Sequence, residues 1–506
     1  MMKRYTLLYT GFLAMLLLVM ASCTSHPDVP SSYQEAKCLP AIFPDYCNVT
    51  IPCNIAPLNF MLPAGEYTEC VARYTMPDGK QQTYGSGVKV QIPAEEWQEM
   101  RDASIGNSIK VEVWGKKNGE WLSFDSFNIN VAVDPIDEYL SYRLIEPSYI
   151  VYDYMEIAQR NLTSFDETQI FNNKVTCDDP KGQCINCHSY QNYKTDNMLF
   201  HVRVTRGGTV LVNDGKASKV DLKRDYTLSA GVYPAWHPTA KFVAFSTNST
   251  HQVFRMADKD KVEVYDSASD LILYDAANDS ISIICNDPEL LEVFPTWSPE
   301  GDYLYYCKTI PLPEEMRDKD IRSTYSFLKY NVYRRSFDMT TSNFGEEELI
   351  YDAASSGKSV SLPRLSPDGR YLLFALGSYG CFHIWHHDAD IACIPLEESL
   401  SSPSDTTLHA PEFIDLTNLN SDGFADSYPS WSSNGKWIMC SSRRIDGTYS
   451  RLYFSYFNNG KVEKAFMLPQ EDPEHNMFRL KCYNRPEYMV EPVTISAEEF
   501  SKVFDR

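Results

Sequence analysis

Short runs of alternating or continuous apolar residues, separated by turn signals, recur along most of the chain. In the N-terminal part they include "TECVARYTM", "SIKVEVWGKK" and "FNINVAV". Turn sequences such as Pro77-Asp78-Gly79 and Lys117-Asn118-Gly119 lie between the runs. About five to seven strands in roughly 100 residues predict a small β-sandwich, immunoglobulin-like, over residues 35–135. The chain as a whole is therefore expected to be mainly β.

The β pattern breaks between residues 136 and 198. Thr163 or Ser164, followed three residues later by an acidic side chain, has the form of a helix N-cap. The pattern predicts a short, partly helical segment between two β domains. Apolar side chains recur there at helical intervals, at Tyr139, Leu140, Leu144, Tyr154, Ile157, Ala158 and Leu162.

Residues 199–490 contain an internal repeat. Its copies read "VYPAWHPTAKFVAFST", "VFPTWSPEGDYLYYCK", "SLPRLSPDGRYLLFAL" and "SYPSWSSNGKWIMCSS", and their first prolines are Pro234, Pro295, Pro363 and Pro429. Each copy joins a proline, a Trp or Leu two residues later, a tight turn and an apolar strand. Self-similar β units of this kind predict a β-propeller. We count five blades, the first of them degenerate, with a sixth if the chain ends contribute one, and a tail over residues 491–506.

The N-terminus has the layout of an export signal. Lys3 and Arg4 precede the apolar run "LLYTGFLAMLLLVMAS", which ends in small residues directly before Cys23. This junction resembles a bacterial lipobox, which implies removal of residues 1–22, acylation of Cys23 and a tether over residues 23–34. An ordinary secretory signal is the alternative. The expected location is the bacterial cell envelope, lipid-anchored at the outer membrane, with the body in the periplasm or at the cell surface.

The formal charge of −22 restricts the partners that the protein can bind. Removal of residues 1–22 takes away Lys3 and Arg4 and no acid, so the charge becomes −24. A surface this acidic argues against nucleic acid, which rewards clustered Lys and Arg. The expected partners are an envelope protein or redox partner, and the membrane through the lipid anchor.

The segment "GQCINCHSY" carries the most specific chemistry in the chain. Cys184, Cys187 and His188 have the order and spacing of a c-type haem site, in which two thiols bind the porphyrin and the imidazole is an axial iron ligand. A structural disulfide that involves Cys177, or a metal or redox site, is the alternative. The covalent cofactor haem c is the favoured prediction.

The sequence does not determine the second axial ligand of such a haem. Met198 is one candidate, because a His/Met pair suits electron transfer, although it also reads as a core residue of a strand. His201 is another, and a remote or missing ligand is the third option.

Other candidate chemistry is sparse. Four cysteines in the N-terminal domain can pair in three ways, and the sequence does not choose among them. "FHIWHHDAD" gathers three histidines and two aspartates, which we interpret as a blade-loop surface rather than a metal site. Motifs for a serine nucleophile, a phosphate loop or a zinc protease do not occur, so no catalytic residue is predicted. The four N-terminal cysteines are Cys38, Cys47, Cys53 and Cys70.

The repeat, in outline xPxWSPDGxxLxF, resembles that of TolB-type periplasmic propellers, although Leu365 replaces the Trp in one copy. The whole chain is similar to lipid-anchored TolB-like proteins of Bacteroidetes-type bacteria that carry a c-type haem motif before the propeller. The resemblance implies electron transfer, or haem-linked docking to an envelope partner. The alternative is a non-enzymatic TolB-like binding or scaffold protein whose CxxC is a structural disulfide. A haem enzyme would need an open iron site and is less favoured.

Overall fold

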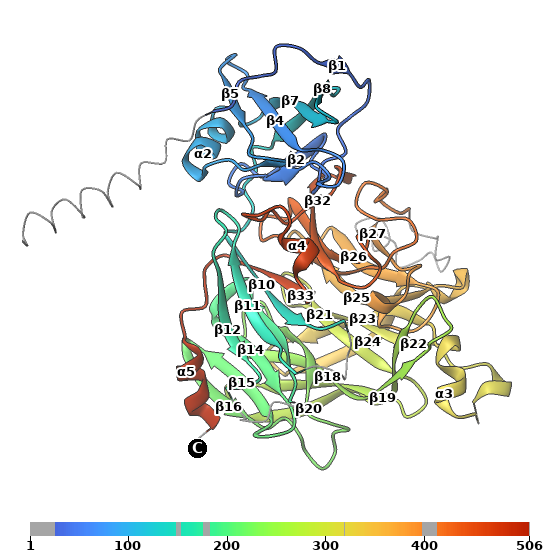
Figure 1. Ribbon diagram of the computed structural model, residues 1–506. Coiled ribbons are helices and arrows are strands. Elements are labelled where there is room, and N and C mark those ends of the chain that lie inside the picture. The colour runs from blue at the N-terminus through green and yellow to red at the C-terminus, as the bar shows by residue number, and fades with distance from the viewer. Residues whose placement is uncertain (1–25, 148–152, 176–182, 318, 397–411, 505–506) are drawn as a thin grey trace, which may run out of the picture.

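The computed structural model describes residues 26–147, 153–175, 183–317, 319–396 and 412–504. These residues form a small N-terminal β domain above a larger ring of β-sheets (Figure 1). The expected signal segment, Cys23 and Cys177 lie outside the described residues. Within the described ranges, no helix is both long and apolar enough to cross a membrane.

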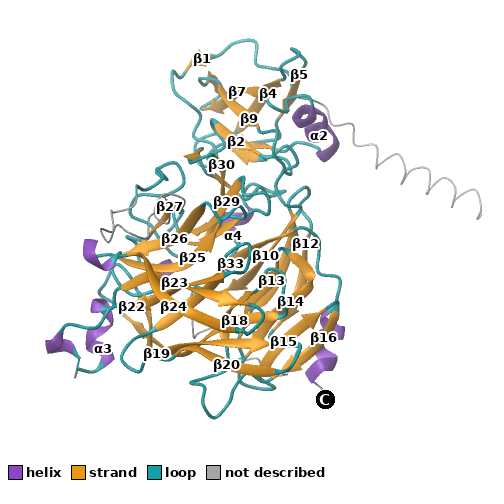
Figure 2. Ribbon diagram, turned by 180° about the vertical axis from the view of Figure 1, so that it is seen from behind, coloured by secondary structure: helices purple, strands orange, loops and turns teal. Residues whose placement is uncertain are grey.

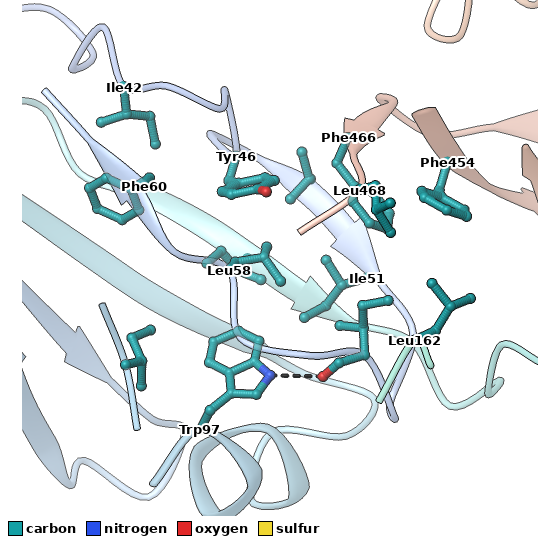
Figure 3. Packing of buried hydrophobic residues seen from close by; sticks show 14 of the residues in the cluster. Ile42, Tyr46, Ile51, Leu58, Phe60, Trp97, Leu162, Phe454, Phe466 and Leu468 are labelled. Atoms are coloured by element: carbon teal, nitrogen blue, oxygen red, sulfur yellow. Dashed lines mark hydrogen bonds between the residues drawn. The ribbon is translucent and has the colours of Figure 1, made fainter. Parts of the chain in front are cut away.

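The N-terminal domain contains the strands expected over residues 35–135. Its main sheet has the order β1-β8-β7-β4-β5, with β9 beside β7 and β2 beside β9, and β3 pairs separately with β6. One helix that the sequence pattern did not predict, α2, packs on the core through Trp97, whose Nε1 donates to the Ile55 carbonyl at 2.9 Å (Figure 3). The elements are β1 (Gln34–Glu35), β2 (Val49–Ile51), β3 (Phe60–Met61), β4 (Glu69–Thr75), β5 (Gln81–Tyr84), β6 (Lys89–Val90), α2 (Ala94–Asp102), β7 (Ser108–Lys117), β8 (Glu120–Ser123) and β9 (Phe127–Val131).

Six further sheets, numbered here 1 to 6, form the rest of the protein. Sheet 1 contains β10 (Tyr139–Ile145), β11 (Glu156–Asn161), β12 (Glu167–Asn172) and β33 (Cys482–Met489). Sheet 2 contains β13 (Ile185–Gln191), β14 (Lys194–Val202), β15 (Gly208–Asn213) and β16 (Lys216–Val220). Sheet 3 contains β17 (Val232–Trp236), β18 (Phe242–Phe254), β19 (Val262–Asp275) and β20 (Ser280–Cys285).

The remaining sheets follow in chain order. Sheet 4 contains β21 (Glu292–Trp297), β22 (Tyr303–Thr309), β23 (Tyr330–Asp338) and β24 (Asn343–Tyr351). Sheet 5 contains β25 (Ser359–Leu365), β26 (Tyr371–Gly377) and β27 (Asp390–Pro395). Sheet 6 contains β28 (Asp426–Trp431), β29 (Trp437–Ser442), β30 (Arg451–Asn458), β31 (Lys461–Val462) and β32 (Phe466–Met467). Short helices α3 (Ile321–Thr324), α4 (His475–Phe478) and α5 (Ala497–Ser501) lie outside the sheets.

One strand of each sheet faces the middle of the ring. These innermost strands are β33, β13, β17, β21, β25 and β28, and each contacts the next, with β28 returning to β33. A closed ring of small antiparallel sheets is the architecture of a β-propeller (Figure 2). The propeller expected from the repeats is present.

Sheet 1 joins the two ends of the ring. Its β33 comes from the C-terminal part of the chain and pairs antiparallel with β10, from more than 300 residues earlier. The helical interpretation of residues 136–198 is wrong, because this region forms β10 to β14. Strand β10 is buried on both faces, so its apolar side chains do not alternate with exposed polar ones, and Leu140 and Leu144 also match the spacing of a helix. The expected N-cap is a turn, in which Asn161 Oδ1 accepts from the Thr163 and Ser164 amides.

The N-terminal domain shares one apolar core with sheets 1 and 6. Tyr46 and Leu58 from the domain belong to the same buried cluster as Phe454, Phe466 and Leu468 from the propeller (Figure 3). Polar contacts reinforce the junction, including the Lys464 ammonium, which donates to the Asp45 carboxylate at 2.7 Å. The domain is therefore fixed on the ring.

Candidate functional site: the central channel

Each innermost strand carries the same backbone irregularity near its middle. One residue per strand has a left-handed backbone, with φ between 49° and 59°, and the strand pairing shifts register at that point. The residue that follows is proline on five of the strands, Pro234, Pro295, Pro363, Pro429 and Pro486. On β13 it is His188. The left-handed residues are Cys187, Tyr233, Phe294, Leu362, Tyr428 and Arg485.

The CxxCH segment is therefore the first copy of the propeller repeat. "NCHSYQ" aligns with "SYPSWS", so that His188 stands at the proline position and Tyr190 at the tryptophan position. The last copy, "NRPEYM" on β33, also has tyrosine at that position. Sequence reasoning missed both copies because neither has the Trp or the Gly turn. A proline two residues before an aromatic side chain was the signal that could have identified the copy on β33.

His188 is fully buried at the centre of the ring. Burial and the nearby positive charges of Arg485 and Arg143 lower the pKa of its imidazole to about 3, so the ring is neutral at physiological pH. Neither ring nitrogen makes a hydrogen bond of good geometry within the described part of the chain, although a backbone group of Ser141 interacts with the imidazole and opposes the lowering of its pKa. Such an incompletely bonded side chain in a native interior calls for a physical explanation.

The two thiols of the motif lie in different surroundings. Cys187 is buried in the apolar cluster that sheets 3, 4 and 5 share around the ring, together with Tyr233 and Phe294. Cys184 is half-buried against a separate cluster between sheets 1 and 2, which contains Ile185. Both thiols are free, as are Cys38, Cys47, Cys53 and Cys70 in the N-terminal domain. Neither the CxxC disulfide nor a pairing among the N-terminal cysteines is formed.

This packing does not fit a covalent haem. A porphyrin bound through both thiols needs them on one side of a single open pocket, next to the imidazole. Cys187 and His188 are enclosed by the ring, and the cavity that reaches the preceding Asn186 has a volume of only about 30 Å³. Cofactor-sized ligands occupy pockets of roughly 300–1,000 Å³. The incompletely bonded nitrogens of His188 are the one feature that agrees with a missing iron ligand.

The candidates for a second iron ligand are core residues of β14. Met198 is fully buried in the cluster between sheets 1 and 2, beside Phe171 and Phe200, and its strand partner is Tyr190. His201 is buried as well, with its Nδ1 3.1 Å from the Thr209 hydroxyl. Burial lowers the pKa of His201 to about 3.

A wider cavity opens on one side of the bulges. It has a volume of about 350 Å³ and is lined by residues of all six innermost strands, so it lies on the ring axis. Arg364 and Glu487 form an ion pair in the wall of this cavity, and the exposed Glu300 lies at its edge. Except for Tyr193, its aromatic lining comes from the repeat position occupied by Tyr190, Trp236, Trp297, Trp431 and Tyr488.

The histidine cluster of residues 383–390 is a surface loop only in part, because His383 and His386 are buried, His387 and Asp388 are half-buried, and Asp390 is exposed. His386 is fully buried, with Nε2 3.1 Å from Glu263 Oε1 on the long hairpin of β18 and β19. Tyr379 donates to the same carboxylate at 2.7 Å. Within the described residues, no group of three or more His, Cys, Asp or Glu side chains is arranged to hold a metal ion. The histidines join sheets 3 and 5.

No family model and no curated protein matches the chain. Among solved structures it is similar to an oligogalacturonate lyase from Vibrio parahaemolyticus, with 13% identity, 66% of this chain and 73% of that chain covered, and a TM-score of 0.34. A putative 6-phosphogluconolactonase from Bacteroides uniformis has 11% identity, coverage of 83% and 98%, and a TM-score of 0.33. A luciferin-regenerating enzyme has 9% identity, coverage of 66% and 96%, and a TM-score of 0.37. Scores this low establish neither fold nor function, and the propeller assignment rests on strand pairing and the ring of contacts.

Proposed function

We propose that the protein is a non-enzymatic, TolB-like binding protein of the bacterial cell envelope, anchored by a lipid on Cys23. In this proposal the six sheets are the blades of a six-bladed docking platform, and the N-terminal domain is a fixed, immunoglobulin-like module. The partner is another envelope protein, which inserts a segment into the 350 Å³ cavity on the ring axis.

The observation that carries the proposal is the incorporation of the CxxCH segment into the propeller repeat. Cys187 and His188 fill the bulge that Tyr428 and Pro429 fill in sheet 6. A repeat position explains why these residues are enclosed, because the bulge packs at the centre of the ring. The wide cavity, in contrast, is lined by all six strands and is the part of the channel with room for a ligand.

A second candidate is the lipid-anchored electron carrier with haem c on Cys184 and Cys187 and His188 as axial ligand. Its support is that neither His188 ring nitrogen makes a hydrogen bond of good geometry among the described residues. The protein would be produced in a host that matures c-type cytochromes and stained for haem on a denaturing gel. The binding-protein proposal expects no haem band, and a covalent haem band that disappears in Cys187→Ala would overturn it.

The docking site is tested directly by photocrosslinking in cells. A photoreactive amino acid would replace Glu300 or Asn192, which line the edge of the wide cavity and are exposed. The matched control position is Asn278, which is exposed in the turn between β19 and β20. We expect one discrete adduct with an envelope protein from both cavity positions and none from Asn278. Equal labelling from all three positions would contradict docking at the channel.

The lipid anchor is tested separately, by metabolic labelling with a clickable palmitate analogue. We expect label on the wild-type protein and none on Cys23→Ser, which should leave the membrane fraction. A labelled Cys23→Ser variant would contradict acylation at this residue.

A further inference from the structure

Three arginines meet on the side of the bulges away from the wide cavity. Arg143 on β10, Arg443 after β29 and Arg485 on β33 line the same small cavity of about 30 Å³. Each is less than one-tenth exposed, with values of 4%, 8% and 5%. Three buried guanidinium groups around one cavity are unusual in a chain whose net charge is −22.

The hydrogen bonds of these arginines are incomplete. The Nε atoms of Arg143, Arg443 and Arg485, and Nη1 of Arg485, have no hydrogen-bond partner within the described part of the chain. Arg143 donates from Nη2 to Asn484 at 2.8 Å, and Arg443 lies 4.2 Å above the ring of Trp385. An unpaired buried donor costs about 1–3 kcal/mol, and more when it is charged.

Carboxylates do not neutralise the group. Among the described residues, Arg143 and Arg443 have no ion pair, and Arg485 has only a long one, 3.8 Å from Glu487, whose carboxylate also binds Arg364. Glu146 lines the cavity too, and it is paired with Lys481. The residues that line the cavity therefore carry three positive charges and one negative charge, and the carboxylates of Asp446 and Asp260 act on Arg443 only from a greater distance.

Titration does not remove this excess at physiological pH. Burial lowers the pKa of Arg443, but a guanidinium starts from such a high value that it stays protonated. The neighbouring His188 is already neutral and contributes no charge. Buried ions of one sign are stable when a counter-ion is present.

We propose that this cavity is a binding site for a small anion, a carboxylate or a chloride ion, held by Arg143, Arg443 and Arg485. A volume of about 30 Å³ holds about two water molecules, so only a monatomic anion or a single carboxylate group enters. The site is separate from the docking cavity, and it stands whether or not the proposed function does.

An adjoining cavity provides the route to this site. It has a volume of about 180 Å³, shares Trp385 and Arg443 with the small cavity, and is also lined by Lys259, Lys261 and one acid, Asp260. Two lysines at the entrance attract anions, and the larger volume accommodates the remainder of a molecule whose carboxylate reaches the arginines. The two anions that the site could hold are the carboxylate of an organic acid and a chloride ion, and the experiment below distinguishes them.

The test is a titration of the full-length protein with sodium acetate and, separately, with sodium chloride. Ionic strength is held constant with a bulky sulfonate salt that is too large for the cavity. We expect saturable binding by calorimetry at one site. Above the dissociation constant, the melting temperature should rise by about 1–3 °C for each tenfold increase in the concentration of the anion that binds. Binding of acetate identifies a carboxylate site, and binding of chloride alone identifies a halide site. No saturable binding of either anion would overturn the proposal.

Two variants separate an anion site from a structural arginine. Arg443→Met should lose the anion-dependent rise and, without anion, should melt at or above the wild-type temperature, because an uncompensated buried charge is gone. The matched control is Arg334→Met, since Arg334 is also 8% exposed and stacks 4.2 Å above a ring, that of Tyr303, but is paired with Glu348 at 2.7 Å. The control should melt lower at every anion concentration and keep the wild-type slope. An Arg443→Met variant with the wild-type slope would refute the site.

Discussion

His188 on β13 and Pro486 on β33 occupy equivalent positions on adjacent innermost strands. Each directly follows a residue with a left-handed backbone, Cys187 with φ 59° and Arg485 with φ 49°. Each lies where the pairing with the next strand shifts register. The histidine of the CxxCH segment is thus, in its backbone, a propeller residue, and this equivalence can be tested by substitution.

His188→Pro should fold normally. The other five strands show that this backbone accepts proline, so we expect a free energy of unfolding within about 1 kcal/mol of wild type. His188→Asp should lose more than about 3 kcal/mol, because it places an unpaired carboxyl in a fully buried position. Denaturant unfolding followed by circular dichroism measures both. A His188→Pro variant as unstable as His188→Asp would show that the imidazole itself is required.

The rate at which a cysteine thiol is modified should be lower the more deeply the thiol is buried. Cys38 is exposed, whereas Cys187 is buried, and burial raises the pKa of the Cys70 thiol to about 12. In the native protein we expect iodoacetamide to modify Cys38 at least about 100-fold faster than Cys70 or Cys187. Peptide mass spectrometry after timed labelling measures the rates, and labelling in denaturant should make the three equal. Rapid native labelling of Cys187 would place it at an accessible surface.

Glu292 should make stability fall with rising pH. It is fully buried, neither carboxylate oxygen has a partner among the described residues, and burial raises its pKa to about 8. Because the folded pKa lies above the unfolded value of about 4.3, the folded state holds this proton more tightly. The stabilisation that the bound proton of Glu292 gives to the folded state is present in full below the unfolded pKa. It is lost as the pH rises toward and through 8.

The corresponding variant is Glu292→Gln. At pH 8.5 we expect it to be more stable than wild type by about 4–5 kcal/mol, with the difference vanishing near pH 4. Chemical denaturation at several pH values measures this difference. The exposed Glu289→Gln removes the same charge in the same region and should show no such pH dependence. Equal pH profiles for the wild type and Glu292→Gln would contradict a buried, protonated carboxyl.

The N-terminal domain and the propeller should lose stability together. Phe466 on β32 is fully buried in the core that both share, so Phe466→Ala should cost about 3–5 kcal/mol. We expect one unfolding transition, shifted as a whole, and faster proteolysis between the domain and sheet 1. Phe413→Ala, at a 43% exposed position, should have little effect. Two separate transitions in the wild-type protein would contradict a common core.

Some of the fold could be predicted from sequence because the signal is local. The Trp-Ser-Pro turn and the strand after it identify a blade wherever they occur, as at Trp297, and the variant turn at Trp431 does the same. β10 could not be recognised in this way, because its burial depends on β33 and on core residues of sheet 6, which lie about 300 residues later in the chain. The repeat on β33 was missed because tyrosine replaces the tryptophan.

The candidate site could not be predicted from local sequence, because it depends on how distant residues pack. Cys184, Cys187 and His188 match a haem motif by spacing, but spacing does not determine whether two thiols face one pocket. The structure directs Cys187 and Cys184 to different apolar clusters. Arg143, Arg443 and Arg485 are about 40 to 340 residues apart along the chain, so only the closed ring brings them to one cavity.

The pairing of β33 with β10 makes completion of the ring a late event in biogenesis. Because a chain is synthesised N-terminus first, β10 is made long before residue 482, and until then sheet 1 has an open edge. The ring therefore closes only in a chain that includes β33. A chain that stops short of β33 would leave the edge of β10 and both sides of the gap without their strand partners.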